Sequence, residues 1–207
     1  MRNKKMAETR FDGRVAIVTG AGGGLGRSYA ILLASRGAKV VVNDLGGATD
    51  GTGSGKSMAE RVTEQIKKAG GEAVPDFNSV FDGEAVVKTA MEAYGKVDIL
   101  INNAGILRDI TFMKQSDTDW NMVLDVHLNG TRNVTKAALP IMRENKYGRI
   151  VMTTSSAGLY GNFGQTNYSA AKMGVVGLAN TLRLEGANYN IKVPTAVPAL
   201  LQQRHCS

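Results

Sequence analysis

The stretch "GRVAIVTGAGGGLGRSYAILLASRGAKVVVNDLGG", residues 13–47, carries the clearest structural signal in the chain. Residues 15–18 are a short run of apolar and β-branched side chains, which is typical of a strand buried on both faces. A glycine-rich turn follows, then residues 26–38 have helical spacing, with Gly37 placed to end the helix. Residues 38–44 form a second apolar run. This order predicts a strand, a tight turn, a helix and a second strand.

The same alternation continues along the rest of the sequence. Strands are expected at 72–77, 97–105 and 148–156, and helices at 58–71, 84–95, 120–143 and 169–187. Repeated β-α units indicate a parallel sheet with helices on both faces. No internal repeat is visible. We therefore predict a single α/β domain of the doubly wound, Rossmann type over residues 11–193, with atypical tails at 1–10 and 194–207.

Composition narrows the classes of function. The chain has 207 residues, of which 43% are hydrophobic and 21% charged, as expected for a soluble globular domain. No apolar run approaches the roughly 18 residues of a membrane span. The net charge of +7 comes from scattered basic residues. A solvated surface explains this best, ahead of a field that attracts anionic nucleotides. A nucleic-acid partner is not expected, because no recognition module is present, and no metal site is indicated.

The glycine turn "TGAGGGLG", residues 19–26, has the features of a phosphate site. Its glycines permit a tight turn and let the backbone approach a pyrophosphate, while the following helix offers free N–H groups. A glycine-rich loop alone is weak evidence, and a plain tight turn is the alternative. Its position between a predicted strand and a predicted helix favours dinucleotide binding.

Asp44 ends the second predicted strand, where an acidic residue can bind the cofactor's adenosine ribose. A carboxylate there accepts hydrogen bonds from both ribose hydroxyls and repels a 2′-phosphate. The next residues, Leu45, Gly46 and Gly47, supply no cation to hold that phosphate. We therefore predict NAD rather than NADP.

Tyr168 and Lys172 lie four residues apart, on one face of a predicted helix, and Ser155 lies near the end of the strand before it. A phenol titrates near about 10, but a neighbouring ammonium and the positive ring of an oxidised nicotinamide favour the phenolate. Ser155 can hold a substrate oxygen while Tyr168 moves a proton and hydride passes to or from the nicotinamide. A surface Tyr–Lys pair is the alternative, which the glycine turn, Asp44 and Ser155 together disfavour.

These motifs together mark a resemblance to a known family. "TGAGGGLG", "NNAG" at 102–105, Ser155 and "YSAAK" at 168–172 resemble the short-chain dehydrogenases/reductases, from about residue 11 to about residue 193. "NNAGILRD", "DVHLNGT" and "GLYGNFGQTNYSAAKMG" are most similar to the (3R)-hydroxyacyl-CoA dehydrogenase units of peroxisomal enzymes. The resemblance implies NAD-dependent oxidation of (3R)-3-hydroxyacyl-CoA to 3-ketoacyl-CoA in peroxisomal fatty-acid β-oxidation. It also implies a homodimer.

The resemblance assigns roles residue by residue. Ser155, Tyr168 and Lys172 would be catalytic. His127 takes the position of the family's catalytic Asn, and we expect it to hold a water beside the lysine; a packed helix residue is the alternative. Ser79 stands where the family usually has an Asp that contacts adenine. The implied cofactor-binding residues are Gly20, Gly24, Leu25, Gly26, Asp44, Ser79, Asn103, Ala104, Gly105, Tyr168 and Lys172.

The C-terminal stretch departs from the family. After residue 193 the family continues with a sixth strand, a substrate loop, two helices and a seventh strand, whereas this chain runs "PTAVPALLQQRHCS". Pro194 and Pro198 suit a strand interior poorly. We therefore expect the last strand and the substrate lid to be missing. This leaves two alternatives open: a catalytically weak or silent fragment that binds NAD or dimerises, and a dehydrogenase of steroids or other secondary alcohols.

Overall fold

A parallel β-sheet forms the centre of the computed structural model, which describes residues 9–47, 50–51 and 57–198. The strands run in the spatial order β3-β2-β1-β4-β5-β6, and every described pair is parallel. The first five are β1 (Val15–Thr19), β2 (Lys39–Asn43), β3 (Glu72–Asp76), β4 (Ile99–Asn102) and β5 (Gly148–Thr153). The chain builds outward from β1 to β3 and then returns to place β4 beside β1. A crevice for ligands is expected at this switch, beyond the carboxyl ends of the strands.

The sheet extends past residue 193. Strand β6 (Ile191–Lys192) and strand β7 (Thr195–Ala196) both pair with β5, one after the other. Pro194 lies between them, and its carbonyl accepts a hydrogen bond from the Met152 N–H at 3.1 Å. The expectation that Pro194 keeps the segment after residue 193 out of the sheet is therefore wrong. A proline lacks only the donor, and its acceptor still serves the ladder. Residues 199–207, the rest of the predicted atypical tail, lie outside the described part, as do residues 1–8.

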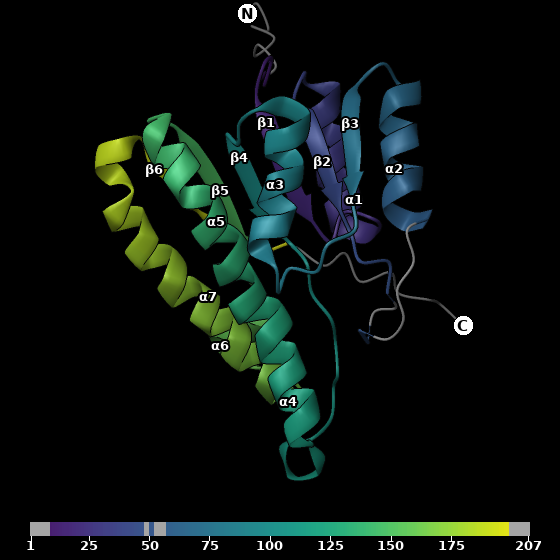
Figure 1. Cartoon of the computed structure of the whole chain (residues 1–207). Coiled ribbons are helices and arrows are strands. Elements are labelled where there is room, and N and C mark those ends of the chain that lie inside the picture. Colours follow the sequence, from purple (N-terminus) through teal and green to yellow (C-terminus); the bar gives the residue numbers. More distant parts are fainter. Residues whose placement is uncertain (1–8, 48–49, 52–56, 199–207) are drawn as a thin grey trace, which may run out of the picture.

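Helices cover both faces of the sheet, as predicted (Figure 1). Helices α1 (Gly24–Ser35) and α2 (Ser57–Lys68) pack on one face. Helices α3 (Gly83–Tyr94), α5 (Gly130–Glu144) and α7 (Thr166–Glu185) pack on the other. Successive residues of β1 supply both cores, because Val15 and Ile17 belong to one cluster and Ala16 and Val18 to the other. The α/β class is confirmed.

The long predicted helix at 120–143 is interrupted in its first half. Helix α4 (Asp117–Leu124) passes into a π-helical turn at Asp125–Asn129, which continues directly into α5. A π turn adds one residue to the helical repeat, and such turns are frequent at functional sites. Here it carries His127, whose side chain is buried.

Shorter elements complete the described part. Two 3-10 turns cover Phe112–Lys114 and Ala187–Tyr189. A short helix, α6 (Ser156–Tyr160), which the sequence did not predict, follows β5 and packs against α7. Helix α6 begins directly after Ser155, whose hydroxyl accepts a hydrogen bond from the Ala157 N–H at 3.2 Å and so caps it.

Candidate active site

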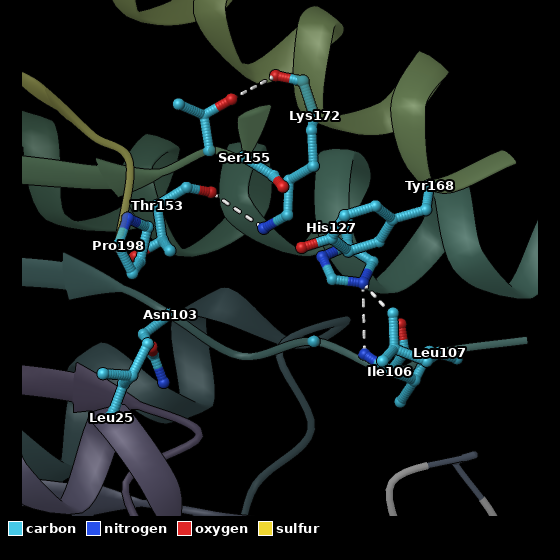
Figure 2. A pocket seen from close by; sticks show the side chains of 12 residues that line it. Leu25, Asn103, Ile106, Leu107, His127, Thr153, Ser155, Tyr168, Lys172 and Pro198 are labelled. Atoms are coloured by element: carbon cyan, nitrogen blue, oxygen red, sulfur yellow. Dashed lines mark hydrogen bonds between the residues drawn. The ribbon is translucent and has the colours of Figure 1, made fainter. Parts of the chain in front are cut away.

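A cavity of about 230 Å³ lies beyond the carboxyl ends of β4 and β5, between α1 and α7 (Figure 2). It gathers side chains that are far apart in the sequence and come from the glycine turn, the segment after β4, the π turn, the end of β5 and α7. Its lining residues are Leu25, Asn103, Gly105, Ile106, Leu107, His127, Thr153, Thr154, Ser155, Tyr168, Lys172 and Pro198. The structure therefore places all four predicted catalytic residues in one cavity.

The glycine turn is clamped against the segment that follows β4. The Asn103 side chain donates to the carbonyls of Thr19 at 3.1 Å and Gly20 at 3.2 Å. Gly20 has a φ of +63°, and a Cβ there would lie 2.8 Å from the Ala104 Cα. A Cβ on Gly26 would lie 2.1 Å from the Gly20 carbonyl oxygen. Only glycine fits this close approach, which leaves bare backbone at the start of α1 for an anion.

Asp44 is held beside this turn. It is the first residue after β2, and its carboxylate accepts hydrogen bonds from the backbone N–H groups of Gly22 at 2.8 Å and Gly46 at 2.7 Å. These two bonds fix the carboxylate against the glycine turn. A carboxylate has further acceptor capacity, so these bonds still leave sites for ribose hydroxyls.

Lys172 is buried one helical turn after Tyr168. Its ammonium donates to the Thr153 carbonyl at 2.8 Å, and the Thr154 hydroxyl donates to the Lys172 carbonyl at 2.9 Å. The ammonium lies 5.5 Å from the centroid of the Tyr168 ring. Figure 2 shows the Ser155 and Tyr168 hydroxyls on the same side of the cavity as the ammonium. Burial lowers the pKa of Lys172 to about 8.

The pKa of Tyr168 is raised above its usual value, chiefly by burial. The facing Ser155 hydroxyl acts against this rise, and the negative charge of Asp109 adds to it. In the protein alone, the net pKa shift of the phenol is therefore opposite in direction to the one expected from the Lys172 charge. The reason is that both side chains lose water on burial, which disfavours both the phenolate and the ammonium.

The His127 side chain lines the cavity. Its Nε2 lies 3.1 Å from the Ile106 N–H nitrogen and 2.8 Å from the Ile106 carbonyl oxygen, so one backbone residue holds the ring. The ring meets Tyr168 edge to face, with 5.0 Å between centroids. Burial, assisted by the Lys172 charge, lowers the pKa of His127 to about 3, so the ring is neutral near pH 7. Its Nδ1 is buried and has no hydrogen-bond partner among the described residues.

Some predicted residues lie away from the cavity, and some lining residues were not predicted. Ser79 follows β3, where its hydroxyl accepts a hydrogen bond from the Phe81 N–H at 3.2 Å, and it does not line the cavity. The unpredicted lining residues are Ile106, Leu107, Thr153, Thr154 and Pro198. Position at or just after the end of a strand was the available signal for these residues. For Pro198 this signal was obscured, because the sequence did not predict a strand directly before it.

Within residues 9–47, 50–51 and 57–198, no group of three or more His, Cys, Asp or Glu side chains is arranged to hold a metal ion. Over the same residues, no helix combines the length and apolarity needed to cross a membrane.

The site combines three features, namely a bare glycine turn, a carboxylate after the second strand and a set of Ser, Tyr and Lys side chains in one cavity. Together they are typical of a dinucleotide-binding α/β protein that transfers protons. The sequence model for short chain dehydrogenases matches residues 14–205. The chain therefore belongs to the short-chain dehydrogenase family of oxidoreductases, which confirms the resemblance seen in its motifs.

Individual relatives agree with this family. The chain is 60% identical over 189 residues to peroxisomal multifunctional enzyme type 2 of Drosophila melanogaster, a match of 91% of this chain and 32% of the relative. It is 57% identical over 189 residues to the peroxisomal hydratase-dehydrogenase-epimerase of Saccharomyces cerevisiae, a match of 91% and 21%. The chain thus spans a third or less of these two relatives.

A solved structure has the same fold. A 7α-hydroxysteroid dehydrogenase in complex with NADH and 7-oxo glycochenodeoxycholic acid superposes with a TM-score of 0.83 at 30% identity, over 91% of this chain and 71% of that one.

Proposed function

We propose that the chain catalyses the NAD-dependent oxidation of (3R)-3-hydroxyacyl-CoA to 3-ketoacyl-CoA, with Tyr168 as the acid–base residue. The observation that carries this proposal is the convergence of Ser155, Tyr168 and Lys172 on one cavity beside the glycine turn. The names of the Drosophila and yeast relatives support the substrate class, because both are peroxisomal enzymes and the yeast name includes a hydratase and a dehydrogenase. The same names support a peroxisomal location. We also propose a homodimer, which the family resemblance implies.

The residues present fit a dinucleotide. Gly20, Gly24, Leu25 and Gly26 would approach the pyrophosphate, since the space that a Cβ on Gly20 or Gly26 needs is already occupied by backbone. Asp44 would bind the adenosine ribose and favour NAD over NADP. The proposed contacts with the rest of the cofactor come from Ser79, Asn103, Ala104, Gly105, Tyr168 and Lys172.

The chemistry then follows from the chain's own side chains. When bound, the oxidised nicotinamide supplies the hydride acceptor. The Ser155 hydroxyl donates a hydrogen bond to the substrate oxygen and orients it. Tyr168 removes the proton from the substrate hydroxyl as the hydride leaves the carbon that bears this hydroxyl, and a carbonyl forms. Lys172 stabilises the phenolate electrostatically and holds the nicotinamide ribose.

His127 is proposed to assist this proton transfer. In the tautomer whose Nε2–H donates to the Ile106 carbonyl, the neutral ring leaves Nδ1 as an acceptor on the side of Lys172, which can hold a water beside the ammonium (Figure 2). The buried, unpartnered Nδ1 favours the side chain for this role. A packed helix residue is the alternative.

One experiment tests the function. Purified protein is given NAD and a (3R)-3-hydroxyacyl-CoA, and NADH absorbance is followed for the wild type and for Tyr168→Phe. We expect turnover by the wild type and a loss on the order of 10²–10⁴ in the variant. NAD binding without turnover would favour a silent fragment instead. Faster turnover of a steroid alcohol would favour the second candidate, which the similarity to the 7α-hydroxysteroid dehydrogenase supports.

A further inference from the structure

Asn167, the residue before Tyr168, has a polar side chain that the mechanism above does not use. It lies in the first turn of α7 and is completely buried, with 0% of its surface exposed. A buried amide has lost its hydrogen bonds to water and must form them inside the protein. Its partners therefore show what it holds in place.

The oxygen of this amide binds the backbone of the catalytic tyrosine. The Tyr168 N–H donates to Asn167 Oδ1 at 2.7 Å. The first N–H groups of a helix have no partner within the helix, and the residue before α7, Gln165, forms no side-chain cap. The Gly164 carbonyl, four residues before Tyr168, accepts instead from the Ile110 N–H at 2.8 Å. Asn167 thus supplies the acceptor for the Tyr168 N–H.

The nitrogen of the same amide binds two other elements. It donates to the Arg108 carbonyl at 3.3 Å, in the segment after β4, and to the Asp119 carbonyl at 3.4 Å, in α4. An NH₂ group has two N–H donors, which match these two carbonyl oxygens. The Arg108 guanidinium also pairs with the Asp119 carboxylate at 2.8 Å, so the two elements are joined to each other as well. Asn167 therefore ties the start of α7 to both.

These contacts connect Tyr168 to the cavity wall that it faces. Arg108 directly follows the lining residue Leu107, and Ile106 holds the His127 ring. Tyr168 points into the cavity from α7 (Figure 2). The amide is bonded to the backbone of Tyr168 on one side and to the backbone next to this wall on the other. The distance between the phenol and the wall therefore depends on the amide.

We propose that Asn167 is a positioning residue that sets the place of the Tyr168 hydroxyl relative to Ser155 and the cavity wall after β4. This inference rests on the proposed role of Tyr168 in proton transfer. Displacing a reacting group by about 1 Å can cost about 10²-fold in rate. Loss of the amide should therefore slow the chemical step. Cofactor binding, which the glycine turn and Asp44 anchor in the proposed function, should change little.

Two variants separate this role from simpler ones. Asn167→Leu has a similar shape and no hydrogen-bonding group. Asn167→Asp, when ionised, keeps an acceptor for the Tyr168 N–H but has no N–H for the two carbonyls. Thr135→Val is the matched control for a loss of stability alone, because the buried Thr135 hydroxyl accepts a hydrogen bond from the Asn102 amide at 2.9 Å.

The measurements are kcat with (3R)-3-hydroxyacyl-CoA, its isotope effect with deuterium at C3, and the Kd of NADH from fluorescence. We expect both Asn167 variants to lose about tenfold to 10²-fold in kcat. Their isotope effect should increase, because product release limits many enzymes and slower chemistry becomes visible. The Kd of NADH should stay within about twofold of the wild type, and Thr135→Val should keep all three values.

Two kinetic results would overturn the proposal. A wild-type kcat in Asn167→Asp would leave the amide as a helix cap alone. A lower kcat with an unchanged isotope effect would mean that fewer molecules are folded, and not that the chemical step is slower.

A second measurement needs no turnover. A crystal structure of Asn167→Leu should show the Tyr168 hydroxyl displaced by about 1 Å relative to Ser155, with Lys172 still bound to the Thr153 carbonyl. A hydroxyl that keeps its place would contradict the proposal. If the wild type oxidises no 3-hydroxyacyl-CoA, the proposed function fails, and this displacement still decides whether Asn167 positions the tyrosine.

Discussion

Replacing Gly105 by alanine would put a methyl group where the His127 ring lies. A Cβ on Gly105 would be 2.3 Å from the ring's Cε1, 3.0 Å from Nδ1 and 3.1 Å from Nε2. The ring cannot simply turn away, because it is 3% exposed and held by the backbone of Ile106. Either the ring leaves this hydrogen bond or the segment after β4 moves.

The cost of the substitution has two parts. Overpacking a tight interior costs about 1–3 kcal/mol. Breaking the contact with Ile106 leaves a buried polar group unpaired, which costs about 1–3 kcal/mol more. We therefore expect Gly105→Ala to lower the free energy of unfolding by about 2–6 kcal/mol. In a chain of this size each kcal/mol shifts Tm by about 2–4 °C.

Urea denaturation of the wild type and variants measures this loss. Gly177→Ala is the matched control, because a Cβ at this helical glycine of α7 meets nothing within 4 Å. Alanine there should stabilise the fold by up to about 1 kcal/mol. Combining Gly105→Ala with His127→Ala should cost less than the sum of the two single changes, since removal of the ring makes room for the methyl group. A Gly105→Ala protein within about 0.5 kcal/mol of the wild type would refute the reasoning.

Three further predictions concern titratable side chains. Asp44→Asn should weaken NAD use, seen as an increase of about tenfold in the ratio of kcat/KM for NADP over NAD; an unchanged ratio would remove Asp44 from the ribose site. The pKa of Lys172 in the fold, about 8, is below its unfolded value, so the unfolded chain binds more protons and stability rises with pH from about 8 to about 10.5. Lys172→Met should lack this rise in the free energy of unfolding, and an equal rise in both proteins would contradict it. The pKa of His127, about 3, is likewise below its unfolded value, so its share of stability falls as pH drops from about 6.5 towards 3. By about pH 5 this loss is about 2 kcal/mol, and it should be absent in His127→Gln.

Much of the fold could be predicted from the sequence because it depends on local patterns. The apolar run before the glycine turn forms β1, and the helical spacing after it forms α1, which Gly37 follows at a φ of +91°. The four-residue spacing of Tyr168 and Lys172 also sufficed, since one helix carries both.

The rest depends on contacts that no local pattern encodes. The π turn at His127 needs the ring to fit against Gly105 and Ile106, two residues from a different part of the chain. Pro198 reaches the cavity only because β6 and β7 run along β5. The direction of the Tyr168 pKa shift depends on burial, which the spacing of Tyr and Lys does not reveal.

The measurement that tests the oxidoreductase proposal most directly is a single turnover with (3R)-3-hydroxyacyl-CoA that carries deuterium at C3. Product NADH is then analysed by mass spectrometry. We predict that the deuterium appears on the nicotinamide with the wild type and at a much lower rate with Tyr168→Phe. Recovery of all the deuterium in unreacted substrate, with NAD bound, would contradict the assignment of this cavity as a hydride-transfer site.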